Sequence, residues 1–185
     1  MKIMRMMNLS WLTSKVCVAG LFLAGSAVAA EQAPHLSFKV TLNPMGSFVA
    51  QSRDMVGDAV ATASGFEASE VSLSIDSLKT GIELRDKHMN QNYFESKKFP
   101  KAIVKGAKGE AGSFKAELTV HGKAQPIEGK YEVRGGPTGP NWIEVRFGTT
   151  LSAFGIEEPS YMGVGVEDEV EVTALVPLRK GASKK

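Results

Sequence analysis

Apolar and polar residues alternate along several stretches of the chain, and the alternation is most regular in residues 114–121, FKAELTVH. A period of two is typical of a β-strand that buries one face and exposes the other. The same pattern runs through residues 36–42, 69–75, 143–147 and 169–176. Shorter, alanine-rich strands are expected in residues 47–51 and 57–62. The sequence therefore predicts a protein built mainly from strands.

The alternation is interrupted once, between residues 76 and 104. Thr80 and Glu83 have the spacing of a capping box, in which each side chain bonds a backbone N–H near the other residue. A short helix is therefore expected from about Ile82 to Asn90, as a helical insertion around residues 80–95. Pro100 ends this insertion, because proline pushes the residue before it into extended geometry.

About eight or nine strands at close spacing, joined by short turns, are expected over the chain. The strongest turn signal is the glycine- and proline-rich stretch at residues 135–140. A succession of short strands is typical of an antiparallel sandwich or a closed barrel, and periodicity alone does not choose between them. The prediction is an all-β protein with one short helix.

The first 30 residues have the organisation of a signal peptide. Basic residues precede an apolar run at residues 16–24, and small residues follow at 27–30. Cleavage is expected near Ala29-Ala30, which leaves residues 31–185 as one domain. The apolar run is too short to span a membrane, so we expect an exported protein with no integral membrane span.

The full chain carries 22 Lys and Arg against 20 Asp and Glu, a formal net charge of +2. Three of the basic residues lie in the signal segment, so the processed chain would be close to neutral. A nucleic-acid partner is not expected, since it requires a strongly basic surface. The single cysteine, Cys17, also lies in the signal segment, and the processed protein is expected to have no disulfide or thiolate chemistry.

The sequence lacks the residue patterns of the common catalytic and metal sites. Its three histidines, His35, His88 and His121, lie far apart, and it has no HExxH motif, paired cysteines or nucleophile elbow. The glycine patterns that bind phosphates or dinucleotides are missing as well. We therefore expect a protein that is not an enzyme and that uses no metal or cofactor.

Residues 77–100, SLKTGIELRDKHMNQNYFESKKFP, resemble the signature of the bacterial YceI family. The shared features are a Ser-Leu-x-Thr-Gly lead, an Arg-Asp-x-His group, an aromatic pair and an aromatic residue before proline. Three later stretches agree with the same family: LTVHGKAQPI (118–127), SAFGI (152–156) and EDEVEVTALVPL (167–178). The resemblance implies an eight-stranded antiparallel lipocalin-like β-barrel, exported to the periplasm, that binds a polyisoprenoid or a similar lipid.

In a water-soluble barrel of this kind the apolar side chains point inward, where they either fill the interior or surround one small ligand. The expected cavity lining is Phe38, Val71, Leu73, Ile75, Val104, Phe114, Leu118, Val120, Ile143, Val145, Phe147, Val170 and Val172. Many of these residues are of medium size, which leaves room for a ligand. From the residues alone, however, a filled core is the commoner outcome for such a set.

The expected function is the binding, sequestration or carriage of a long apolar lipid, such as a polyisoprenoid, a quinone tail or a fatty-acid-like amide. The alternatives are a structural or interaction module with a filled core and, less favoured, a small eight-stranded outer-membrane barrel. The membrane barrel would turn its apolar face to lipid, but the chain has few aromatic residues for two interfacial girdles. A homodimer is left open by the sequence.

The candidates for a rim at the barrel mouth lie in the helical insertion: Arg85, Asp86, His88, Tyr93 and Phe94. In one interpretation Arg85 contacts the phosphate or quinone head group of the lipid. In the other, Arg85 and Asp86 attach the helix to the barrel through hydrogen bonds, which is the commoner role of such groups.

Overall fold

The computed structural model describes residues 33–44, 46–135, 141–158, 160–161 and 164–181. The expected signal segment, with Cys17 and the cleavage site at Ala29-Ala30, lies outside the described residues. Most of the turn at residues 135–140 lies outside them as well. Among the helices of the described part, none has the length and apolar character that a membrane crossing would need.

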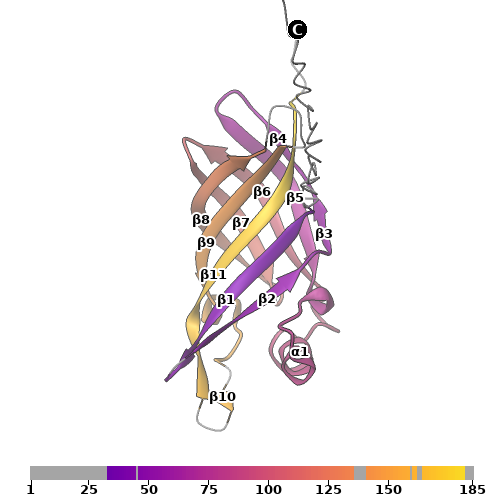
Figure 1. Ribbon diagram of the computed structural model, residues 1–185, viewed down its shortest axis with the longest axis vertical. Helices are drawn as coiled ribbons and strands as arrows, with labels where there is room; N and C mark the ends of the chain where they lie inside the picture. Colours follow the sequence, from indigo (N-terminus) through magenta and orange to yellow (C-terminus); the bar gives the residue numbers. More distant parts are fainter. Residues whose placement is uncertain (1–32, 45, 136–140, 159, 162–163, 182–185) are drawn as a thin grey trace, which may run out of the picture. The chain divides into compact units, whose positions relative to one another are not determined.

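Strands make up most of the described residues, and they are joined by short turns and one helical segment (Figure 1). The strands are β1 (His35–Asn43), β2 (Ser47–Ser52), β3 (Met55–Gly57), β4 (Ala59–Ala61), β5 (Gly65–Ser74), β6 (Lys101–Glu110), β7 (Ser113–Val120), β8 (Lys123–Arg134), β9 (Asn141–Thr150), β10 (Ser160–Tyr161) and β11 (Val164–Arg179). The helical elements are η1 (Ile75–Ser77), α1 (Glu83–His88), the π-helical turn η2 (Met89–Tyr93) and η3 (Ser152–Phe154).

Seven strands form a closed ring, in the order β11-β4-β5-β6-β7-β8-β9 and back to β11. The expectation of an all-β barrel with one short helix is therefore confirmed, but the ring has seven strands where eight were expected. The reason is that β1 and β2 form a hairpin on the edge of β11 and do not enter the ring. Strand β4 closes the ring by pairing with β11 in parallel, over two residue pairs.

The register of β6 and β7 shows how the alternating pattern makes a barrel interior. Leu118 of β7 pairs with Val104 of β6, and both side chains face the core. Lys115 and Glu117 on the other face of β7 are exposed. The pairing between β6 and β7 shifts at Gly106, whose backbone has a φ of 59°, and β6 then continues to Glu110. A bulge of this kind bends the strand, which helps the sheet to close.

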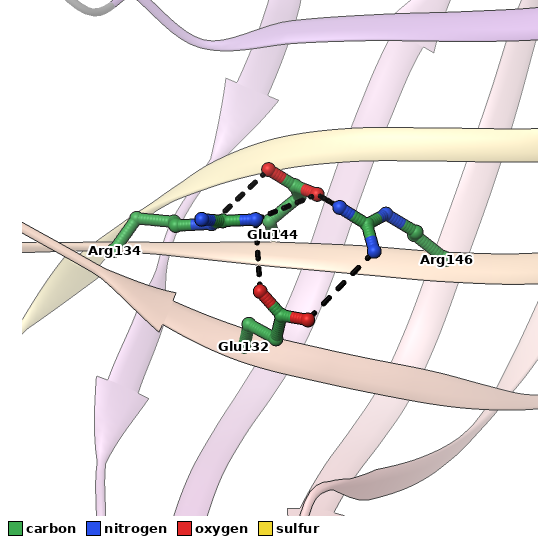
Figure 2. Close-up of polar contacts among 4 residues, drawn as sticks. All are labelled: Glu132, Arg134, Glu144 and Arg146. Carbon is green, nitrogen blue, oxygen red and sulfur yellow. Dashed lines mark hydrogen bonds and ion pairs between the residues drawn. The ribbon is translucent and has the colours of Figure 1, made fainter.

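The outer face of the barrel carries charged side chains. Figure 2 shows four of them on β8 and β9, where Arg134 contacts Glu132 at 2.8 Å and Glu144 at 3.3 Å. Arg146 contacts the same two carboxylates. Exposed ion pairs contribute little to stability. What these pairs show is that the outer face of β8 and β9 is polar. An outer-membrane barrel needs an apolar outer face at the lipid, and the described strands have the opposite arrangement.

Candidate functional site

The interior of the barrel contains an apolar cavity of about 150 Å³. All thirteen side chains that the alternation places inward line this cavity. The lining also includes the small residues Ala59, Ala68 and Ala174. Protein cores have few voids larger than a water molecule, so a space of this size argues against a completely filled core. Whether the lining residues contact a ligand stays a prediction.

The cavity lining is almost free of polar groups. Its polar side chains are the hydroxyls of Ser72, Thr149 and Thr150, and no charged side chain belongs to it. An ionised group placed here would lose its hydration without gaining a partner, which is very unfavourable. Apolar atoms form almost all of the cavity surface, so the cavity is suited to hydrocarbon.

Different residues close the two ends of the cavity. At the end where β5 begins and β6 ends, Phe66 is buried and packs edge-to-face on Tyr131, with ring centroids 4.8 Å apart. At the other end, Leu78 and Phe94 from the helical segment join the lining, and so does Phe154 of η3. The end beside the helical segment is thus covered by short elements that are not part of the sheet.

The helical segment, residues 75–100, connects β5 to β6 at this end of the barrel (Figure 1). Its helix α1 covers six residues, Glu83–His88, and continues as the π-helical turn η2 to Tyr93. The prediction of a helical insertion around residues 80–95 is confirmed. The prediction of a capping box between Thr80 and Glu83 is wrong, because the N-cap residue is Ile82 and makes no side-chain capping bond.

Thr80 instead forms hydrogen bonds with the carboxylate of Asp86, which lies on α1. Its backbone N–H and its hydroxyl both donate to Asp86 Oδ1, at 2.7 and 2.6 Å. Arg85 Nε donates in turn to Thr80 Oγ1 at 2.9 Å, and the guanidinium carbon lies 4.2 Å from the centre of the Phe48 ring on β2. These contacts fix α1 to the loop before it and to the β1–β2 hairpin.

The five rim candidates therefore have different surroundings. Asp86 is buried and bonded to Thr80, and Arg85 stacks on Phe48, so both serve the attachment of the helix. Phe94 lines the cavity, Tyr93 is half-buried against the core, and His88 is half-buried on α1. A contact of these residues with a lipid head group stays a prediction.

Asp86→Ala is expected to lower the free energy of unfolding by about 1–3 kcal/mol, because it leaves the Thr80 N–H and hydroxyl without their acceptor. Urea denaturation followed by circular dichroism measures the change. Lys87→Ala removes an exposed side chain from the same helix and is the control, expected to change stability by no more than about 0.5 kcal/mol. Equal effects of the two variants would contradict the anchoring role of Asp86.

A second contact that the sequence alone does not indicate joins the helical segment to the β7–β8 turn. His121 Nε2 lies 2.8 Å from Glu95 Oε2, and the ring packs edge-to-face on Phe99 with centroids 4.5 Å apart. His121 Nδ1 lies 3.3 Å from the carbonyl oxygen of Phe154 in η3. One histidine thus connects three short elements that cover the same end of the cavity.

Asp168 of β11 holds η3 in place. The Ser152 backbone N–H donates to Oδ1 at 2.7 Å and the Ser152 hydroxyl donates to Oδ2 at 2.5 Å. These bonds, the hydroxyl bond first, lower the pKa of Asp168 below its ordinary value, because they favour the charged carboxylate. Phe154, two residues after Ser152, is part of the cavity lining.

Asp168→Asn is expected to destabilise the protein at neutral pH and to have progressively less effect in acid. A carboxyl with a lowered folded-state pKa contributes stability above its ordinary pKa of about 4, and the contribution is lost as the pH falls through the folded-state value. Urea midpoints measured from about pH 7 to about pH 2 for wild type and variant test this dependence. Glu169→Gln, which removes an exposed neighbouring carboxylate, is the control. A difference between wild type and Asp168→Asn that does not change with pH would contradict the assignment.

The fold and the cavity together define a small β-barrel with one apolar interior site. A model of the YceI-like domain matches residues 24–177, and the chain belongs to this family. YceI-like domains are binding proteins, and the prediction that the chain is not an enzyme agrees with this membership. Within the described residues, no three His, Cys, Asp or Glu side chains are grouped so that they could hold a metal ion.

Several solved structures share this barrel. Burkholderia cenocepacia BcnA is 14% identical with a TM-score of 0.62, over 77% of this chain and 95% of that one. A polyisoprenoid-binding domain from Saccharophagus degradans, implicated in plant cell wall breakdown, is 16% identical with a TM-score of 0.61, over 77% and 91%. The Campylobacter jejuni YCEI protein is 21% identical with a TM-score of 0.55, over 69% and 82%. At these identities the likeness concerns the fold. The comparison with curated proteins finds no match.

Proposed function

We propose that this protein binds the hydrocarbon chain of a polyisoprenoid, or of a lipid with a similar long tail, inside the barrel. The observation that carries the proposal is the cavity, whose lining contains three hydroxyls and no charged side chain. The structural neighbour described as a polyisoprenoid-binding domain supports it, since the two barrels superimpose over most of their length. A binding role of this kind needs no catalytic group.

The character of the lining favours a neutral ligand. A fatty acid carries a carboxylate, which would have to stay outside the cavity or lose its charge inside it. A prenol or a quinone carries no charge, so burying its polar group costs far less than burying a carboxylate. Among the lipids considered from the sequence, polyisoprenoids and quinone tails therefore fit the cavity best.

The volume of the cavity limits how much of a lipid tail fits before the lining side chains move. A volume of about 150 Å³ is enough for a benzene-sized apolar group, so a longer chain enters as lining side chains change rotamer. Each buried methylene contributes roughly 0.8 kcal/mol, so a five-carbon unit contributes about 3–4 kcal/mol before the cost of ordering it. A few buried units give micromolar affinity, about −8 kcal/mol.

The proposed function takes place in the periplasm, because residues 1–30 have the pattern of a signal peptide. A carrier or scavenger there would shield the lipid tail from water on its way between membranes. The homodimer that the sequence leaves open stays a prediction, and the proposed site is complete within one chain.

The test offers delipidated protein a polyprenol and, separately, a saturated fatty acid of similar length, and records native mass spectra. The expected result is one polyprenol per chain, with much weaker retention of the fatty acid. Failure to retain any polyprenol would contradict the proposal, and equal retention of the fatty acid would contradict the preference for a neutral ligand.

A further inference from the structure

The helical segment exposes two large apolar side chains that are two residues apart in the sequence. Ile82 is 53% exposed and Leu84 is 60% exposed, although both belong to the short stretch that covers one end of the cavity. A soluble protein usually turns such residues of a helix toward its core. Here Leu78, Met89 and Phe94 pack the segment against the core. Ile82 and Leu84 take no part in this packing.

The segment that carries Ile82 and Leu84 has more exposed basic than acidic residues. Between β5 and β6 the exposed charged residues are four lysines, Lys79, Lys87, Lys97 and Lys98, and two carboxylates, Asp76 and Glu83. Lys98 and His121 both contact Glu95, and Arg85 and Asp86 bond Thr80, so these charges have partners within the protein. Lys101 at the start of β6 adds another exposed positive charge. Exposed apolar residues flanked by lysines are typical of surfaces that settle into the head-group region of an anionic membrane.

The location of the segment relates this surface to the cavity. Strand β2 meets the segment through an isolated bridge, in which Gln51 and Lys79 exchange two backbone hydrogen bonds of 2.8 Å. The Ser52 and Ser77 hydroxyls also hydrogen-bond at 2.6 Å, and Arg85 stacks on Phe48. The sheet is not continuous here, and Leu78 and Phe94 on the inner side of the segment line the cavity. A lipid tail leaving a membrane at this place would reach the cavity lining after displacing a few side chains and the hydrogen bonds between β2 and the segment.

We propose that Ile82, Leu84 and the exposed lysines of the helical segment form a surface that docks the barrel, helical segment first, onto an anionic lipid bilayer. This inference rests on the proposed function, since it names the place from which the lipid tail passes between membrane and cavity. Ile82 and Leu84 enter the head-group region, and Lys79 and Lys87 contact lipid phosphates. The rest of the barrel stays in water, consistent with its charged outer face.

The test is co-sedimentation of the mature protein with vesicles of phosphatidylcholine and phosphatidylglycerol, with pure phosphatidylcholine vesicles as the neutral comparison. We expect binding to the anionic vesicles that weakens strongly near 1 M salt, where the Debye length is about 3 Å. Ile82→Ser/Leu84→Ser and Lys79→Glu/Lys87→Glu should each weaken binding by about tenfold or more. Val60→Ser/Val133→Ser, at exposed valines of the other barrel end, is the matched control and should bind as wild type does.

Uptake of detergent-dispersed polyprenol, measured on the same variants, separates this inference from the proposed function. We expect all variants to take up dispersed polyprenol as wild type does, because none of the substituted residues lines the cavity. Normal uptake together with equal vesicle binding of wild type and Ile82→Ser/Leu84→Ser overturns the docking surface alone. Self-association through the apolar pair, with no vesicle binding, overturns it too. Absent uptake in every variant overturns the proposed function instead.

Discussion

Leu118→Trp is expected to abolish polyprenol uptake while the protein still folds. Leu118 lies on β7, is buried, pairs with Val104 of β6 and lines the cavity. An indole at this position occupies most of the space that a prenyl chain would take. Overpacking of a core typically costs about 1–3 kcal/mol of stability, less than the full stability of a domain of this size. Native mass spectrometry with offered polyprenol measures uptake, and circular dichroism measures folding.

The control for this experiment is Glu117→Trp, one residue earlier on the same strand. Glu117 is exposed on the outer face, so a tryptophan there adds the same bulk without entering the cavity. It should leave uptake unchanged. If Leu118→Trp took up polyprenol as wild type does, the ligand would have to lie elsewhere, and the cavity would be no more than a packing defect.

Phe66→Ala is expected to lower the free energy of unfolding by about 3–5 kcal/mol, the usual range for removing a buried phenyl ring. Phe66 is 2% exposed and packs on Tyr131 at the barrel end away from the helical segment. Gly109 on β6 leaves space for this ring, because a β-carbon there would overlap it. Urea denaturation measures the effect, and Gly109→Ala should also destabilise the protein, in this case by crowding the ring.

Val133→Ala provides the comparison, since Val133 is 62% exposed and its truncation should change stability by no more than about 0.5 kcal/mol. A loss of less than 1 kcal/mol for Phe66→Ala would mean that the barrel end is not closed by this ring. The same variant enlarges the apolar interior, so uptake of polyprenol by the folded fraction should persist.

The strands with regular alternation could be located from the sequence, together with the direction of their side chains. In β7 and in residues 170–178 of β11 each second residue is apolar, and a one-residue change of register would expose all of them at once. The interior positions Phe114, Leu118 and Val172 follow from this constraint. The closed barrel did not follow from periodicity and was implied by the family resemblance in residues 77–100.

The parts that could not be predicted depend on contacts between distant residues. Residues 53–61 divide into the short strands β3 and β4, with Gly57 at a φ of 122° at the end of β3, and the β1–β2 hairpin lies outside the ring, which therefore has seven strands. The carboxylate that Thr80 binds is that of Asp86, six residues on, in place of the Glu83 of a capping box. The contact between His121 and Glu95 spans 26 residues and has no local signal.

The most direct measurement of the central claim is a crystal structure of the protein loaded with polyprenol. The expected density is a single chain running inside the ring of strands, between Phe66 at one end and Phe94 at the other, in contact with Leu118 and Val172. Density for the lipid only on the outer face, with the interior closed by the barrel's own side chains, would contradict the account.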